Sequence, residues 1–228
     1  MTGAGPESGT EGIRAVLFDF GGVILSSPFE AFASYESANG LPPDTIRTIN
    51  ATNPDTNAWA RLERSEVDIA GFCELFEAEA AALGHRVDAA AVLGLLAGEL
   101  RPAMALAIER IDDAGYLLGL LTNNVAALGD VGHGRHADAA VSAGIDALLA
   151  RFDLVLESSR AGVRKPDPRF YELACEGLRI EPSEAVFLDD LGVNLKPARA
   201  MGMRTIKVID PAAALAELGS VLDLDLAG

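Results

Sequence analysis

Five short, almost uninterrupted apolar runs stand out along the 228-residue chain, and polar side chains lie at or just after the ends of most of them. The runs cover residues 13–19, 116–122, 152–158, 185–190 and 204–209. Strands buried on both faces of a parallel sheet show such continuous runs, whereas half-exposed strands alternate apolar and polar positions. The pattern therefore predicts five parallel β-strands.

Helical periodicity separates the later runs. In residues 167–178, Asp167 is a suitable N-cap, Pro168 is a suitable first helical residue, and apolar side chains recur at intervals of three and four. Residues 194–202 and 211–222 show the same period. Strands that alternate with helices predict an α/β fold with a doubly wound parallel sheet.

The first two runs are about a hundred residues apart, which is far more than one crossover helix needs. The intervening residues carry amphipathic helical patterns and no convincing strand. We expect them to form a helical cap, inserted after the first strand and beside the sheet edge where open α/β sheets bind ligands. The predicted organisation is a flexible tail at 1–12, a core domain at 13–27 and 104–228, and a cap at 28–103.

The composition limits the kinds of partner that the chain can bind. The chain has 18 basic and 34 acidic residues, a net charge of −16, which repels a polyphosphate backbone and argues against nucleic acid. No apolar stretch reaches the roughly 18 residues of a membrane span, and the N-terminus lacks a signal-peptide pattern. Cys73 and Cys175 are far apart in the sequence, and we expect both to be reduced thiols. We expect a soluble cytoplasmic protein with a small-molecule ligand; the sequence does not predict its oligomeric state.

Polar side chains follow four of the predicted strands. In chain order they are Asp19, then Thr122, Asn123 and Asn124, then Lys165, then Asp189 and Asp190. Any one of them alone is an ordinary turn or cap residue. Because the carboxyl ends of parallel strands line one edge of the sheet, the full set predicts a shared site there.

The residue types at this edge suit phosphate chemistry with a metal ion. Carboxylates on neighbouring strands repel one another unless a cation lies between them, and oxygen ligands of this kind suit Mg²⁺. A magnesium-held phosphate needs a nucleophile, a hydroxyl donor and a cation, which Asp19, Thr122 and Lys165 supply. Gly21 and Gly22 let the backbone turn, so that a carbonyl can face the metal and amides can approach the phosphate.

These motifs carry a family resemblance. The segment from Glu157 to Val208, with RKPDP around Lys165 and FLDDLGVN around the aspartate pair, is its most specific part. The chain resembles the haloacid dehalogenase superfamily over residues 13–218. Within it, the chain is most similar to the phosphatase domain at the N-terminus of soluble epoxide hydrolase and to related domains of acyl-CoA dehydrogenase fusion proteins. The resemblance implies a Rossmann-like sheet and a cap that closes over the substrate.

The resemblance also implies residue roles. Asp19 would be the nucleophile that forms an aspartyl-phosphate, while Thr122, Asn123, Lys165 and the backbone of Gly22 would bind the phosphoryl group. Asp19, Asp190 and the backbone carbonyl of Gly21 would ligate Mg²⁺, and Asp189 and Asn194 would support that shell. The expected function is a Mg²⁺-dependent phosphatase that acts on a small organic phosphate.

One position departs from the family pattern. The phosphatases usually carry a second aspartate two residues after the nucleophile, as general acid and base, and this chain has Gly21 there. The loss of such a group costs about 10²- to 10⁴-fold in rate. Three interpretations stay open: a phosphatase that is slow or selective for good leaving groups, a hydrolytic dehalogenase, and a non-catalytic protein that binds a phosphate ligand or regulates a partner.

The cap holds two further features. Trp59 lies on an amphipathic stretch, where packing in the cap core is the first expectation and lining the substrate cavity is the second. Carboxylates recur nearby at Glu63, Glu66, Asp68 and Glu74, which is typical of a solvated helix face.

Overall fold

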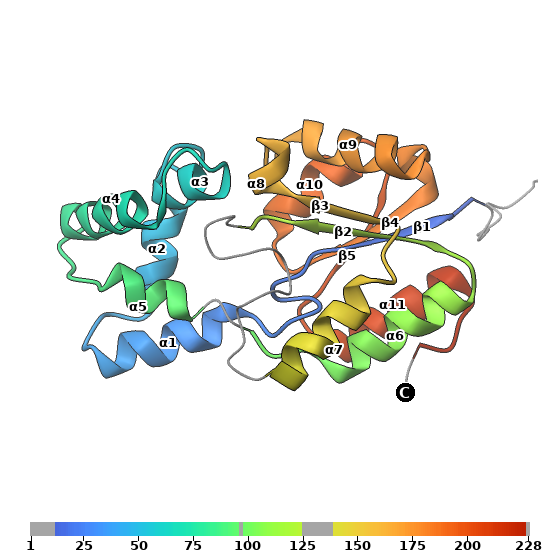
Figure 1. Cartoon of the computed structure of the whole chain (residues 1–228), viewed down its shortest axis with the longest axis horizontal. Helices are drawn as coiled ribbons and strands as arrows, with labels where there is room; N and C mark the ends of the chain where they lie inside the picture. Colours follow the sequence, from blue (N-terminus) through green and yellow to red (C-terminus); the bar gives the residue numbers. More distant parts are fainter. Residues whose placement is uncertain (1–11, 96–97, 125–138, 227–228) are drawn as a thin grey trace, which may run out of the picture.

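The computed structural model describes residues 12–95, 98–124 and 139–226, and its centre is a five-stranded parallel sheet of order β3-β2-β1-β4-β5 (Figure 1). The strands are β1 (Ala15–Phe18), β2 (Leu117–Thr122), β3 (Leu154–Glu157), β4 (Ala185–Asp189) and β5 (Arg204–Lys207). The predicted doubly wound α/β fold is confirmed. The strands are shorter than the apolar runs by up to two residues at an end, and the predicted tail lies, apart from Gly12, outside the described residues.

Helices cover both faces of the sheet, which explains why the strands are apolar throughout. Val16 and Phe18 pack against one layer, formed by α6 (Pro102–Asp113), α7 (Ala139–Leu149) and α11 (Pro211–Leu222). Ala15 and Leu17 point to the other layer, formed by α9 (Pro168–Leu178) and α10 (Gly192–Ala200). Successive side chains of a strand point to opposite faces, so a sheet between two helical layers needs no polar position.

Local signals begin α9 where the sequence predicts, whereas α10 begins two residues before the predicted segment at 194–202. The Asp167 carboxylate accepts a hydrogen bond from the backbone N–H of Arg169 at 2.9 Å, and Pro168 is the first residue of α9. Proline suits that position because its missing N–H would have no partner in the first turn. The helix then packs Phe170 and Tyr171 against the sheet.

The insertion between β1 and β2 is helical, as predicted. It contains α1 (Pro28–Ala38), α2 (Thr45–Ala51), α3 (Ala58–Glu63), α4 (Ile69–Ala82) and α5 (Ala89–Gly94), which lie to the left of the sheet in Figure 1. These helices share a hydrophobic cluster of their own, in which the Trp59 ring lies 4.7 Å from Phe72, centroid to centroid. Trp59 is 8% exposed, which confirms its predicted core packing. The domain boundaries stay a prediction.

The two segments that connect this insertion to the sheet run side by side. The backbone N–H of Ser26 donates to the Glu99 carbonyl at 2.8 Å, and the Ser26 hydroxyl accepts from the Glu99 N–H at 2.9 Å. Further along, the Arg101 N–H donates to the Ile24 carbonyl at 3.0 Å. The chain therefore leaves and re-enters the sheet layer at one place.

Two short helices complete the described chain, α8 (Ser158–Ala161) after β3 and the 3-10 turn η2 (Pro182–Glu184) before β4. Within the residues that the structure describes, none of the helices has the length and apolar character required to cross a bilayer.

Candidate active site

One cavity of about 510 Å³ lies between the carboxyl edge of the sheet and the helical insertion. Most of the predicted site residues line it, namely Asp19, Gly21, Thr122, Asn123, Lys165, Asp190 and Asn194. Strand register explains why they meet: Phe18 pairs with both Leu120 and Leu188, so Asp19 and Asp189 end their strands at the same level. Asp189 itself is fully buried behind the cavity wall.

Lys165 joins two of the carboxylates. Its Nζ lies 2.8 Å from Asp19 Oδ1 and 2.8 Å from Asp189 Oδ2, and its side chain is 1% exposed. The Asp19 Oδ1 also accepts a hydrogen bond from the Phe20 backbone N–H at 2.7 Å. Both contacts engage the same oxygen, and no described residue hydrogen-bonds Asp19 Oδ2. One oxygen of Asp19 is thus fixed while the other is available to a ligand.

Asp189 is held on every side. It accepts hydrogen bonds from the Asn194 amide at 3.0 and 3.1 Å, from the Leu191 backbone N–H at 2.8 Å and from Lys165 Nζ. A buried carboxylate with several donors is fixed in orientation and costs less to desolvate. Asp189 therefore positions Lys165, and Asn194 holds Asp189. Their support of a metal shell stays a prediction.

Burial sets the charge states around this group. Burial raises the pKa of Asp19 well above its usual value, and the Lys165 charge only partly opposes the rise. Burial also disfavours charged Lys165, but the carboxylates of Asp189 and Asp19 outweigh it, so the Lys165 pKa is raised. Burial, with the nearby Asp189, raises the pKa of Asp190 to about 6. A cation beside these carboxylates would favour their ionised forms.

Asp19, Asp189 and Asp190 could hold such a cation. Each offers one carboxylate oxygen, and these atoms lie within 4.8 Å of one another. Hard oxygen ligands of this kind fit Mg²⁺. Gly22 lies directly against Asp190 with a φ of +83°, and a Cβ there would collide with the Asp190 carboxylate. The glycine therefore keeps space for Asp190 as well as permitting the turn.

Thr122 and Asn123 end β2 on the cavity wall. Thr122 is 5% exposed. The Asn123 side chain brackets Lys165: its Oδ1 accepts from the Lys165 backbone N–H at 2.9 Å, and its Nδ2 donates to the Lys165 carbonyl at 3.0 Å. Asn123 therefore fixes the loop that carries the lysine, which the sequence did not predict. Contacts of Thr122 and Asn123 with phosphoryl oxygens stay a prediction.

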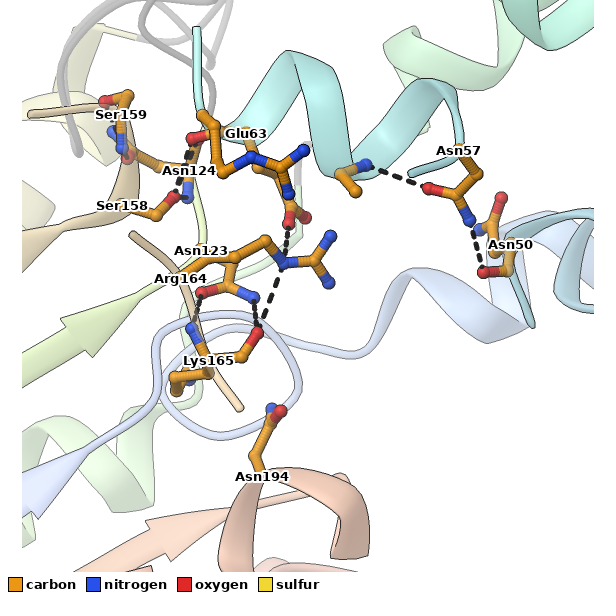
Figure 2. A network of polar contacts seen from close by, with 12 residues as sticks. Asn50, Asn57, Glu63, Asn123, Asn124, Ser158, Ser159, Arg164, Lys165 and Asn194 are labelled. Carbon is orange, nitrogen blue, oxygen red and sulfur yellow. Dashed lines mark hydrogen bonds and ion pairs between the residues drawn. The ribbon is translucent and has the colours of Figure 1, made fainter. Parts of the chain in front are cut away.

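A second polar network joins the sheet to the insertion (Figure 2). The Asn124 amide donates to Glu157 Oε1 at 2.6 Å, and its Oδ1 accepts from the Ser159 hydroxyl at 2.9 Å. The Ser158 hydroxyl lies 3.0 Å from the carbonyl of Glu63, at the end of α3. These bonds place the end of α3 over the strand ends.

The prediction of a solvated face is wrong for Glu63. Glu66, Asp68 and Glu74 are exposed, but the Glu63 side chain is 15% exposed and lies in the cavity wall. Its Oε2 lies 2.9 Å from Arg164 Nε, and Figure 2 shows the two side chains facing each other. Burial raises the pKa of Glu63, and the Arg164 charge opposes the rise. Glu63 and Arg164 are 101 positions apart, so no spacing signal links them.

Comparison with known proteins identifies the family of this chain. The haloacid dehalogenase-like hydrolase model matches residues 13–202, and the chain belongs to that family of hydrolases.

Curated relatives extend the match. The chain is 35% identical over 227 residues to acyl-CoA dehydrogenase family member 10 of Mus musculus, covering 96% of this chain and 20% of that protein. It is 30% identical over 229 residues to bifunctional epoxide hydrolase 2 of Sus scrofa, covering 94% of this chain and 40% of that protein. Both matches confirm the predicted resemblance, and the chain spans less than half of either relative. Validoxylamine A 7'-phosphate phosphatase of Streptomyces hygroscopicus subsp. limoneus is 28% identical over 194 residues, 83% of each chain.

Solved structures share the fold. A haloacid dehalogenase family enzyme of Bacteroides thetaiotaomicron, in complex with magnesium and inorganic phosphate, matches with a TM-score of 0.55 and 18% identity. The match covers 86% of this chain and 94% of that one. A dehalogenase solved as an intermediate complex matches with a TM-score of 0.61 and 20% identity, over 92% and 97% of the two chains.

Proposed function

We propose that this hydrolase is a Mg²⁺-dependent phosphatase that cleaves a small organic phosphate through an aspartyl-phosphate on Asp19. The observation that carries the proposal is the arrangement at the strand ends: Asp19 has one oxygen held 2.8 Å from buried Lys165, and three aspartates offer oxygens within 4.8 Å. A carboxyl nucleophile, a buried cation and a cluster for a divalent ion, which would favour the ionised nucleophile, are what phosphoryl transfer requires.

In the first step, Asp19 Oδ2 attacks the phosphorus atom and the bond from phosphorus to the ester oxygen breaks. The Lys165 ammonium, with the Thr122 hydroxyl and the Asn123 and Gly22 groups, neutralises and orients the phosphoryl oxygens. The leaving group departs as an alcohol once its oxygen has taken a proton. In the second step, water attacks the aspartyl-phosphate, which releases inorganic phosphate and regenerates Asp19.

Mg²⁺ bound by Asp19, Asp190 and the Gly21 carbonyl would lower the repulsion between the phosphate and the carboxylates. Asp189 and Asn194 hold Lys165 in place for both steps.

Gly21 limits the protonation of the leaving group. No side chain at that position can donate a proton, so another group or solvent must supply it, and substrates with acidic leaving groups gain an advantage. The rate is therefore expected to depend steeply on the leaving-group pKa.

The test is phosphate release from phenyl phosphate, glucose 1-phosphate and acetyl phosphate, with Mg²⁺ and with a chelator. We expect metal-dependent release that falls about 10⁴-fold or more in Asp19→Asn, because the nucleophile is lost. Asp225→Asn removes an exposed carboxylate far from the cavity and serves as the control. Equal rates for wild type and Asp19→Asn would overturn the proposal.

A hydrolytic dehalogenase is the second candidate, because Gly21 removes the second aspartate and dehalogenases share the fold. Asp19 would then attack carbon and expel a halide without needing a metal. The adjacent carboxylates argue against this, since their repulsion calls for a cation. Halide release from 2-chloropropionate in chelator would favour the dehalogenase. No turnover of any compound, with phosphate raising the melting temperature, would favour a phosphate-binding protein.

A further inference from the structure

The backbone of Lys165 is held at both of its polar groups. The Asn123 side chain accepts from the Lys165 N–H at 2.9 Å and donates to the Lys165 carbonyl at 3.0 Å. Arg164 Nε donates to the same carbonyl at 3.2 Å. Asn123 directly follows β2, but Arg164 belongs to the same loop as Lys165 and has a long side chain with many rotamers. Arg164 can therefore stabilise the loop only if a group outside the loop fixes its side chain.

The helical insertion supplies such a group. Glu63 Oε2, at the end of α3, lies 2.9 Å from Arg164 Nε. The Glu63 side chain is 15% exposed and that of Arg164 is 21% exposed, so solvent screens this ion pair only in part. Arg164 Nε thus contacts the Glu63 carboxylate and the Lys165 carbonyl together, as Figure 2 shows.

The place of Glu63 depends on how the insertion docks on the sheet edge. The Ser158 hydroxyl donates to the Glu63 carbonyl at 3.0 Å, and the Ser65 hydroxyl donates to the Ser159 carbonyl at 3.3 Å. Both bonds join the end of α3 to the segment that follows β3. A shift of the insertion would therefore move the Glu63 carboxylate relative to the loop that contains Lys165.

We infer that Glu63 and Arg164 are positioning residues that tie Lys165 to the helical insertion. The Glu63 charge holds the Arg164 side chain where it bonds the Lys165 carbonyl, and the held backbone keeps Lys165 Nζ 2.8 Å from Asp19 Oδ1. This role needs no contact with the substrate. The inference rests on the proposed phosphatase function and deepens it: full activity requires the insertion to be docked through this one ion pair.

Steady-state kinetics with phenyl phosphate and Mg²⁺ test the link. Glu63→Gln and Arg164→Gln should each lower kcat about 10-fold, because a displaced ammonium stabilises the transition state poorly. Both should lower kcat by a larger factor than they raise KM, since the charge counts most in the transition state. The double variant should be about as slow as the slower single variant, because both changes break one link. Effects that multiply would mean two independent roles and would overturn the inference.

Ser65→Ala is the matched control. It removes a hydrogen bond of the same contact, two residues after Glu63, but the Ser65 hydroxyl bonds Ser159 and not the Lys165 loop. We expect its kcat to equal that of wild type. An equal loss of kcat in Ser65→Ala would mean that any weakening of the docked insertion slows the enzyme, and that the ion pair has no particular role.

Hydrogen exchange separates a failure of the link from a failure of the phosphatase. The exchange rate of the Lys165 backbone N–H is measured by NMR without substrate, relative to the N–H of Phe187 in β4, which reports global opening. It should be about 10-fold faster in Glu63→Gln and Arg164→Gln, because the loop opens more often, and unchanged in Ser65→Ala. Faster exchange supports the link even if no phosphate ester is hydrolysed.

Two results would overturn the inference. One is wild-type exchange at Lys165 in both Glu63→Gln and Arg164→Gln, whatever the phosphatase rate. The other is faster exchange together with an unchanged kcat in an active enzyme, which would show that the link does not serve the reaction.

Discussion

The two walls of the cavity differ in how their polar groups are paired. On the sheet side, Lys165 lies between two carboxylates, and Asp189 accepts hydrogen bonds from three sources. On the cap side, the indole of Trp59 and one oxygen of Glu63 have no hydrogen-bond partner among the described residues. Both walls are buried, so solvent exposure does not account for the contrast.

The difference teaches which parts of a site are fixed in advance. The groups that would meet the phosphate are the same for every substrate and can be organised by the sheet edge itself. The groups on the cap side have no such dense set of bonds, apart from the ion pair of Glu63 with Arg164. Substitutions on the two sides should therefore differ in their cost to stability.

The largest effect on stability should come from Lys165→Met, which removes the cation on the sheet side of the cavity. Removing the cation leaves Asp19 and Asp189 buried without the positive charge between them, and the free energy of unfolding should fall by about 3–5 kcal/mol. Urea unfolding measures this, with Lys196→Met on the exposed side of α10 as control. Adding Asp189→Asn should recover part of the loss. A change below about 1 kcal/mol would mean that the wall does not depend on its ion pairs.

Gly22→Ala should have the next largest effect. It places a Cβ at positive φ and against the Asp190 carboxylate, so we expect a loss of about 1–3 kcal/mol together with weaker Mg²⁺ binding. Thermal unfolding and metal titration measure the two parts. Gly21→Ala is the matched control, because a Cβ at Gly21 meets nothing within 4 Å. Equal losses in both variants would show that the close approach of Gly22 to Asp190 is unimportant.

Gly21→Asp should add to the sheet side of the cavity a carboxyl group that can protonate the leaving group. The space around Gly21 is open, so the carboxylate fits, and the hydrolysis of alkyl phosphates should rise about 10-fold or more. Acetyl phosphate, whose leaving group needs little protonation, should gain much less. Gly21→Asn has the same size without the acid and should give no such gain. An equal gain for both leaving groups would show that protonation of the leaving group does not limit the rate.

The smallest effect concerns the charge of Glu63 on the cap wall. Burial raises its pKa above 4.5, so the native state holds a proton that the unfolded state releases. This contribution to stability is complete below pH 4.5 and is lost as the pH rises through the native pKa. The melting temperature of Glu63→Gln relative to wild type should therefore increase as the pH rises from 4.5 to the native pKa of Glu63, and stay constant above it. The exposed control Glu74→Gln should show no trend, and a flat difference for Glu63→Gln would contradict the prediction.

Much of the sheet side of the cavity could be predicted from the sequence, because its residues lie at the ends of strands that the sequence itself marks. Four of the five apolar runs end at a polar residue, and a parallel sheet necessarily brings these ends together, which placed Asp19, Thr122 and Asp190 in one cavity. The cap wall could not be predicted in this way. A pair such as Glu63 and Arg164 forms only when α3 docks on the loop after β3, and that contact depends on tertiary packing.

Asn123 illustrates the limit within the sheet wall itself. Its position after β2 indicated a polar group at the site, but the direction of its amide depends on the loop around Lys165, 42 positions away. Sequence reasoning could assign it to the cavity wall and could not assign its partners.

The hydrogen bonds between Ser26 and Glu99 have a consequence for how such proteins diversify. The insertion is joined to the sheet by two neighbouring segments, at Ser26 and Glu99. The helices between these residues could therefore be exchanged or lengthened as one unit without shifting the strand register. A new insertion would bring a new cap wall to an unchanged set of reacting groups. The same reacting groups could in this way serve enzymes that act on different leaving groups.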